Sequence, residues 1–182
     1  MKRFSSSPLV RLAAAALAAP LLLAGGVSSA AAWGPAPPGF VCDAQSGGTV
    51  QPVPPLASVA TVRAGRHPAF DRFVIEFAGS APVPPFDVRP QASPTFALDP
   101  SGQEVTLLGR AGVLIVVHDA SQHDGFTGPT DLKPRLPLLR EARAIGDFEG
   151  VVRWGLGVQR PACARVFTLS APTRLVVDLA RH

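Results

Sequence analysis

The sequence lacks several features that would point to a familiar enzyme or sugar-binding protein. Its 182 residues include no tyrosine and two tryptophans, whereas sugar-binding surfaces usually present exposed aromatic rings. It contains no Gly-x-Ser-x-Gly motif and no glycine-rich phosphate-binding loop. These absences argue against a serine hydrolase and against a nucleotide-binding protein.

No apolar run is long enough for a membrane span. The longest, Leu12 to Leu23, has about a dozen residues, whereas a transmembrane helix needs about 20. Basic residues precede the run, and Ala30 to Ala32 supply small residues before a cut at Trp33. Residues 1–32 are therefore predicted to be a secretory signal peptide, the alternative being a retained membrane anchor.

A lipid anchor is not expected either. Leu23 to Gly26 has the form of a lipoprotein box, with Gly26 where the lipidated cysteine would stand. Without that thiol no lipid can be attached. We expect a secreted, extracellular protein, released or cell-wall associated, with no membrane anchor after signal cleavage.

The mature chain has little net charge. Of 17 Lys and Arg, three (Lys2, Arg3 and Arg11) lie in the predicted signal, which leaves 14 against 13 Asp and Glu. A nearly balanced charge gives no support for nucleic acid as a partner.

Proline and glycine are concentrated in residues 33–57, where six prolines interrupt any regular hydrogen-bonding ladder. We expect this segment to be an extended tether. It contains Cys42, one of the two cysteines of the chain.

Alternating patterns dominate the rest of the chain, residues 58–182. In Asp71 to Phe77 the apolar residues Phe73, Ile75 and Phe77 share one face, and the pattern returns in Thr173 to Leu179. About nine or ten such short segments, separated by turn signals, predict an all-β fold, an antiparallel β-sandwich. They span residues 59–63, 71–77, 86–89, 95–98, 104–108, 113–117, 151–156, 165–169 and 174–179, with an ambiguous tenth at 136–145.

The ambiguous segment, Leu136 to Ile145, has apolar spacing that suits a helix, but Pro134 and Pro137 crowd its start. We expect a strand there, with a helix as the alternative. Farther along, Trp154 is expected in the core. Gly155 and Gly157 beside it indicate a bulge or a close backbone approach.

The two similar strands are predicted to pair antiparallel with Val74 opposite Val176. In that register Arg72 faces Asp178 and Glu76 faces Arg174, so two opposite-charge pairs flank the valines. The alternative is that the strands occupy equivalent places in the two sheets.

The two cysteines remaining after export, Cys42 and Cys163, can pair within one molecule only with each other. Such a bond would pin the tether to the domain. Two free thiols or a disulfide-linked dimer are the alternatives.

The folded part resembles the AMIN-like domain family of secreted actinobacterial proteins, which looks related to the AMIN targeting module of cell-wall amidases. The resemblance rests on segments that occur in the expected order, at residues 62–72, 146–150, 155–157, 165–169 and 174–178. It implies a β-sandwich and a role at the cell envelope, where peptidoglycan is the implied ligand. The amidases carry a zinc hydrolase domain after this module, and we expect none in the 182 residues here.

Polar residues in turns are the candidate ligand-binding residues: Arg66 and His67 in one turn, Asp147 and Glu149 in another. Asp147 and Glu149 would share a face of an extended chain and could act as an acid–base pair or bind a cation. The alternative is a hairpin corner with Phe148 in the core and the acids in water. Arg66 and His67 could form a polar pocket with Asp71 and Arg72, or brace the turn.

A metal site is the remaining catalytic candidate. His118-Asp119 and His123-Asp124 are imidazole–carboxylate pairs of the kind found around zinc, but no third ligand is suitably spaced. We therefore expect no catalytic residue, metal or cofactor.

The expected function is that of a non-catalytic, exported cell-envelope module that binds cell-wall polymer or an envelope protein. A structural or protein-interaction domain is the alternative. A small metal-dependent hydrolase is the most distant one.

Overall fold

The computed structural model describes residues 38–79 and 81–181, so the predicted signal peptide lies outside the described residues. Thirteen β-strands and no helix occur within these ranges. In this part of the chain no helix has the length and apolarity to cross a membrane. The strands are β1 (Gln45–Gly47), β2 (Ala57–Arg66), β3 (Phe70–Phe77), β4 (Phe86–Gln91), β5 (Thr95–Ala97), β6 (Glu104–Thr106), β7 (Ala111–His118), β8 (Ala120–Ser121), β9 (Asp131–Leu132), β10 (Leu139–Phe148), β11 (Val151–Val158), β12 (Ala164–Leu169) and β13 (Arg174–Ala180).

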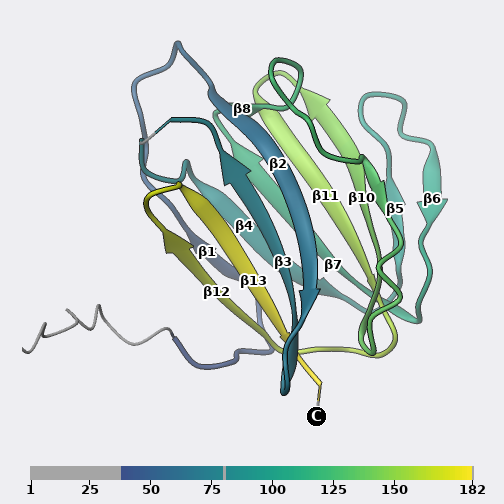
Figure 1. The fold of residues 1–182 in the computed structure, drawn as a ribbon. Helices are drawn as coiled ribbons and strands as arrows, with labels where there is room; N and C mark the ends of the chain where they lie inside the picture. Colours follow the sequence, from purple (N-terminus) through teal and green to yellow (C-terminus); the bar gives the residue numbers. More distant parts are fainter. Residues whose placement is uncertain (1–37, 80, 182) are drawn as a thin grey trace, which may run out of the picture. The chain divides into compact units, whose positions relative to one another are not determined.

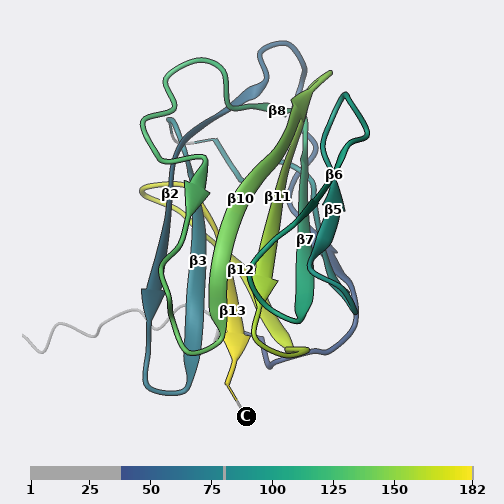
Figure 2. The ribbon, with the colours of Figure 1, turned by 90° about the vertical axis from the view of Figure 1, so that its right-hand side faces the viewer.

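Two sheets face each other in a β-sandwich (Figures 1 and 2). One has six strands in the order β1-β4-β7-β11-β10-β9, and the other has five in the order β12-β13-β3-β2-β8. All pairings are antiparallel except the short contact of β2 with β8. The predicted all-β sandwich is confirmed.

The inward-facing residues of both sheets form one apolar core, as the alternating patterns predict. Phe73 from β3 lies against Trp154 from β11, with ring centroids 5.5 Å apart. The indole N–H of Trp154 donates to Oε1 of Gln122 at 3.0 Å, so its polar atom is satisfied inside the core.

A second small core lies outside the six-stranded sheet, beneath the β5–β6 hairpin, where Phe96, Leu107 and Ile145 cluster. A Cβ on Gly157 would lie 2.3 Å from the carbonyl oxygen of Leu108. The glycines of β11 therefore allow the close backbone approach that the sequence predicted. This covering layer also explains why β7 is apolar on both faces.

Ten of the thirteen strands correspond to the predicted segments, and the ambiguous segment contains strand β10 rather than a helix. The extra strands β1, β8 and β9 have two or three residues each. They lie in segments expected to be tether or loop, where short pairing leaves almost no sequence pattern.

The segment from Val41 to Gly47, within the predicted extended tether, pairs with both sheets. Val41 forms a β-bridge with Ala164 of β12, with both N–H···O distances 2.8 Å. Gln45 to Gly47 then pairs with β4 of the other sheet. This segment therefore connects the edge strands of both sheets on one side of the sandwich (Figure 1).

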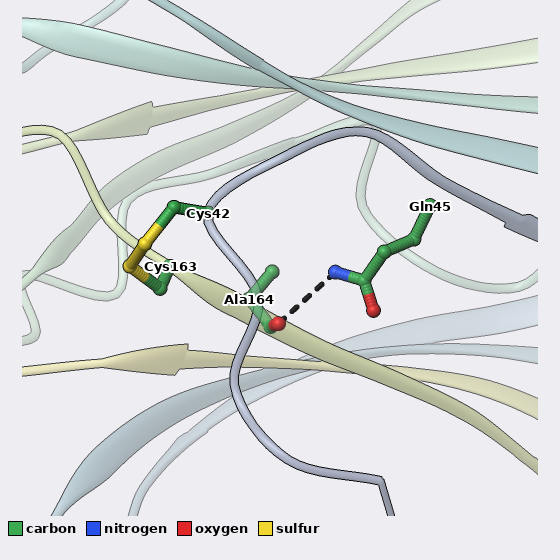
Figure 3. The surroundings of a disulfide bond; sticks show 4 residues. All are labelled: Cys42, Gln45, Cys163 and Ala164. Carbon is green, nitrogen blue, oxygen red and sulfur yellow. Dashed lines mark hydrogen bonds between the residues drawn. A yellow bond between two sulfur atoms is a disulfide. The ribbon is translucent and has the colours of Figure 1, made fainter.

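A disulfide joins the same segment to the domain (Figure 3). Cys42 and Cys163 are bonded, with Cα atoms 4.0 Å apart, so the predicted intramolecular pairing is confirmed. Gln45 adds a side-chain hydrogen bond, its Nε2 donating to the carbonyl of Ala164 at 3.0 Å.

Candidate functional site

A cluster of charged and aromatic side chains lies on the outer face of the five-stranded sheet. There β13 lies between β12 and β3, and the register places Asp178 opposite Arg165 on one side and Arg72 on the other. Because alternate residues of a strand share a face, Phe70 joins Arg72 and Phe167 joins Arg165 on this surface. We call Phe40, His67, Phe70, Arg72, Arg165, Phe167 and Asp178 the outer-face cluster.

Asp178 is the centre of the cluster. Its side chain is fully buried and accepts two hydrogen bonds from Arg72, with Nε to Oδ1 at 2.6 Å and Nη2 to Oδ2 at 2.9 Å. Arg165 also bonds Oδ2, its Nε at 3.1 Å. One buried carboxylate thus fixes two guanidinium groups: Arg72 bonds both of its oxygens in the bidentate geometry that arginine favours, and Arg165 bonds Oδ2 alone.

Aromatic rings surround these guanidinium groups. The Cζ atom of Arg165 lies 4.9 Å from the ring centroid of Phe40 and 5.0 Å from that of Phe70. The Cζ atom of Arg72 lies 5.2 Å from Phe70 and 5.5 Å from Phe167. These distances are within the range of cation–π attraction.

The cluster remains open to solvent at its surface. The side chains of Arg72 and Arg165 are 26% and 19% exposed, and the three phenylalanines are half-buried. His67 extends the cluster toward the β2–β3 turn, with its ring stacked on Phe70 at a centroid distance of 4.5 Å. With two guanidinium groups and one carboxylate, the outer-face cluster carries one net positive charge among its aromatic rings.

The predicted strand register is observed, with Val74 opposite Val176 and Arg72 opposite Asp178. Arg72 and Asp178 form the expected ion pair, but Glu76 and Arg174 do not. Although Arg174 lies opposite Glu76, it donates to the carbonyl of Pro172, and Glu76 bonds Arg63 at 2.7 Å instead.

The four candidate ligand-binding residues lie at opposite ends of the sandwich. Arg66 ends β2, whereas the turn containing Glu149 lies beside the start of that strand, because Ala120 pairs with Ala57 and bonds the carbonyl of Gly150. The structure therefore does not bring the two pairs together (Figure 1).

Asp147 and Glu149 also differ from both predicted arrangements. Asp147 accepts a hydrogen bond from the backbone N–H of Gln122 at 2.8 Å and lies 2.8 Å from Nδ1 of His123. Glu149 is exposed, with a φ of 49°. Phe148 is 48% exposed, so the expectation that it is buried in the core is wrong. A two-residue turn after a fully paired strand end leaves that ring outside the sandwich.

The paired histidines do not form a metal site together. His118 Nε2 lies 3.1 Å from Asp87 Oδ2, and His123 contacts Asp147 rather than its neighbour Asp124. Among residues 38–79 and 81–181, no group of three or more His, Cys, Asp or Glu side chains could hold a metal ion.

Sequence reasoning identified Arg72 and Asp178 as a pair but missed Arg165, Phe167 and Phe40. The alternation of Arg165 and Phe167, together with the short turn joining β12 to β13, was a usable signal for the first two. Phe40 carried no such signal, because its position depends on the disulfide-linked segment before β1.

Comparison with known proteins assigns the β-sandwich domain to one family. A search of curated proteins finds no match. The family model described as the AMIN-like domain matches residues 57–181, which include β2 to β13. The chain therefore belongs to the AMIN-like domain family.

Proposed function

We propose that the protein is a secreted, non-catalytic module of an actinobacterial cell envelope that binds the cell wall through the outer-face cluster. Its family is related to cell-wall targeting. The Cys42–Cys163 disulfide fits an extracytoplasmic location. The predicted signal peptide at residues 1–32 would supply the route of export.

One observation carries the proposal: partly exposed aromatic rings and guanidinium groups share the outer face of one sheet, where the buried carboxylate of Asp178 fixes the guanidinium groups. Rigid rings of this kind can stack on the apolar faces of sugar rings. The guanidinium groups can donate hydrogen bonds to hydroxyl, amide and carboxylate oxygens. These are the groups that peptidoglycan presents.

The domain division is part of this proposal. Residues 58–182 are the AMIN-like sandwich, and residues 33–57 connect it to the signal. The disulfide-linked segment before β1 contributes Phe40 to the cluster. Arg66 and His67 remain in the proposed binding surface, and Asp147 and Glu149, at the other end, do not.

Co-sedimentation with purified peptidoglycan tests the proposal. The peptidoglycan is first freed of covalently attached anionic polymers, so that only glycan and stem peptide remain. Protein expressed from the full chain should sediment with it, and the double variant Phe70→Ala/Phe167→Ala should remain largely in the supernatant. Phe148→Ala is the matched control, because it removes an exposed phenylalanine at the other end. Equal sedimentation of all three proteins would contradict the proposal.

A protein partner is the second candidate, and one surface feature favours it. A groove of about 560 Å³ lies beside the Pro-rich segment, lined mainly by prolines and apolar side chains from residues 51–52, 54–58, 77–79 and 81–82. Retention of an envelope protein by immobilised wild-type protein, without sedimentation on peptidoglycan, would favour this candidate.

A further inference from the structure

A basic depression adjoins the outer-face cluster at the β2–β3 turn. It has a volume of about 410 Å³ and is lined by Arg66, Pro68, Ala69, Pro137, Arg160 and Arg181. These residues come from four separated parts of the chain, which meet at one end of the sandwich. We call this depression the arginine pocket.

Two of its three guanidinium groups are anchored by the backbone. The guanidinium of Arg181 donates to the carbonyls of His67 and Pro68, and that of Arg160 donates to the carbonyl of Arg181. A guanidinium carries five N–H donors, so donors remain for a ligand. Anchoring reduces the side-chain entropy that binding would otherwise cost.

The third guanidinium, that of Arg66, forms no hydrogen bond or ion pair with any residue in the described ranges, and it is exposed. It stands at the rim with its donors available. The pocket therefore combines two fixed guanidinium groups with one that can adjust to a ligand.

Among the described residues, the carboxylate paired with these groups is that of Asp71. Asp71 is fully buried and already accepts the N–H groups of Leu138 and Leu139, at 2.7 and 3.0 Å. Its Oδ1 lies 3.9 Å from Nε of Arg181, and neither atom has a hydrogen-bond partner among the described residues. Among the described residues, the three positive charges of the pocket and the one negative charge of Asp71 leave an excess of two positive charges. The pocket thus favours an oxyanion. The planar guanidinium group of arginine presents a fork of N–H donors that matches the oxygens of phosphate and carboxylate groups.

We propose that the arginine pocket binds a phosphate group of an anionic cell-wall polymer. The pocket rim offers only Pro68, Ala69 and Pro137 as apolar groups, and none of them is a long side chain that could insert into a bilayer. A polymer lying over the outer-face cluster would reach the pocket past His67, whose ring stacks on Phe70. The inference deepens the proposed function and rests on it for the source of the phosphate.

Calorimetric titration with a synthetic glycerol phosphate oligomer tests the inference, using protein expressed from the full chain. Wild-type protein should bind the oligomer, more weakly as salt is raised. The double variant Arg66→Ala/Arg160→Ala should bind the oligomer at least about tenfold more weakly. Hydrogen bonds between charged groups contribute more to the free energy of binding than those between neutral groups, and this variant loses two guanidinium groups. Arg89→Ala/Arg174→Ala removes the same charge at other places and should bind as the wild type does. An unchanged melting temperature checks that each variant is folded.

Each other outcome decides against the inference. Equal binding by wild type and the pocket variant, equal weakening by both double variants, or no binding by the wild type would overturn it. Binding to phosphatidylglycerol vesicles but not to the oligomer would overturn the choice of a wall polymer.

The two proposals can fail separately. Sedimentation on phosphate-free peptidoglycan without binding of the oligomer would leave the proposed function standing and remove this inference. Binding of the oligomer that depends on Arg66 and Arg160, without sedimentation on phosphate-free peptidoglycan, would support this inference and contradict the proposed function.

Discussion

The two ends of the sandwich differ in how their charged groups are satisfied. At the β10–β11 end, Asp147 is bonded by Gln122 and His123, which lie in a neighbouring loop. At the β2–β3 end, Arg66 has no partner among the described residues, and the pocket carries an excess of positive charge. A charge satisfied locally stabilises the fold, whereas an unsatisfied, solvent-facing charge is available to a ligand. Glu149, at the β10–β11 end, is exposed but is an acid, so the excess of positive charge is confined to the β2–β3 end. This contrast supports the proposal that the binding surface lies at the β2–β3 end and on the adjoining outer face.

The largest expected effect on the free energy of unfolding comes from replacing Asp71, and it is compared with the replacement of Asp147 at the other end. Asp71→Ala should lower the free energy of unfolding by about 3–5 kcal/mol, because two backbone N–H groups and Arg181 lose a buried anionic partner. Asp147→Ala should cost about 1–2 kcal/mol, because Asp147 is partly exposed and accepts one backbone N–H. Urea denaturation of both variants measures the difference. Equal losses would mean that the two carboxylates are equally structural.

Loss of the disulfide should have the next largest effect. The Cys42→Ser/Cys163→Ser variant should lose about 2–4 kcal/mol, because the bond restricts a long loop in the unfolded chain. Since Phe40 precedes Cys42, sedimentation on peptidoglycan should also weaken. Thiol titration and a non-reducing gel check the bond in the wild type. Two titratable thiols, or a dimer that a reductant converts to monomers, would contradict the structure.

The smallest effect is expected at Glu149. Its φ of 49° is a conformation that glycine adopts without steric cost, so Glu149→Gly should raise the free energy of unfolding by up to about 1 kcal/mol. Wall binding should not change. Glu149→Ala, which keeps the steric cost, is the control for the backbone effect. Loss of sedimentation in both variants would show that the acidic end takes part in binding.

Much of the fold could be predicted because burial leaves a strong two-residue pattern. Phe73, Ile75 and Phe77 in β3 identify the inward face, and the same pattern in β13 predicts the observed register, Val74 opposite Val176. The strand β1 could not be predicted, because Gln45 to Gly47 has no apolar side chain to show an alternating pattern and is placed by backbone pairing with β4 next to the disulfide-linked segment.

The site was harder to predict than the fold. The sequence predicts turns at Arg66 and His67 and at Asp147 and Glu149, and this predicted position made them candidates. In the structure Arg66 is the last residue of β2, and Asp147 lies in β10. Turn position does not show whether a side chain is already bonded, and Asp147 is bonded by a residue 25 positions away. The contribution of Arg160 and Arg181 to the pocket depends on the meeting of separated turns, which no local pattern records.

Mapping the binding surface by NMR tests the central claim most directly. Uniformly labelled protein is titrated with soluble peptidoglycan fragments, and amide shift changes are assigned to the two ends and the outer face. The account predicts that the largest changes gather around Phe70, Arg72, Arg165 and Phe167, with His67 and Arg66 at the margin. The amides of Asp147 to Gly150 should remain unchanged. Shift changes concentrated at Asp147 to Gly150, with none on the outer face, would contradict the account.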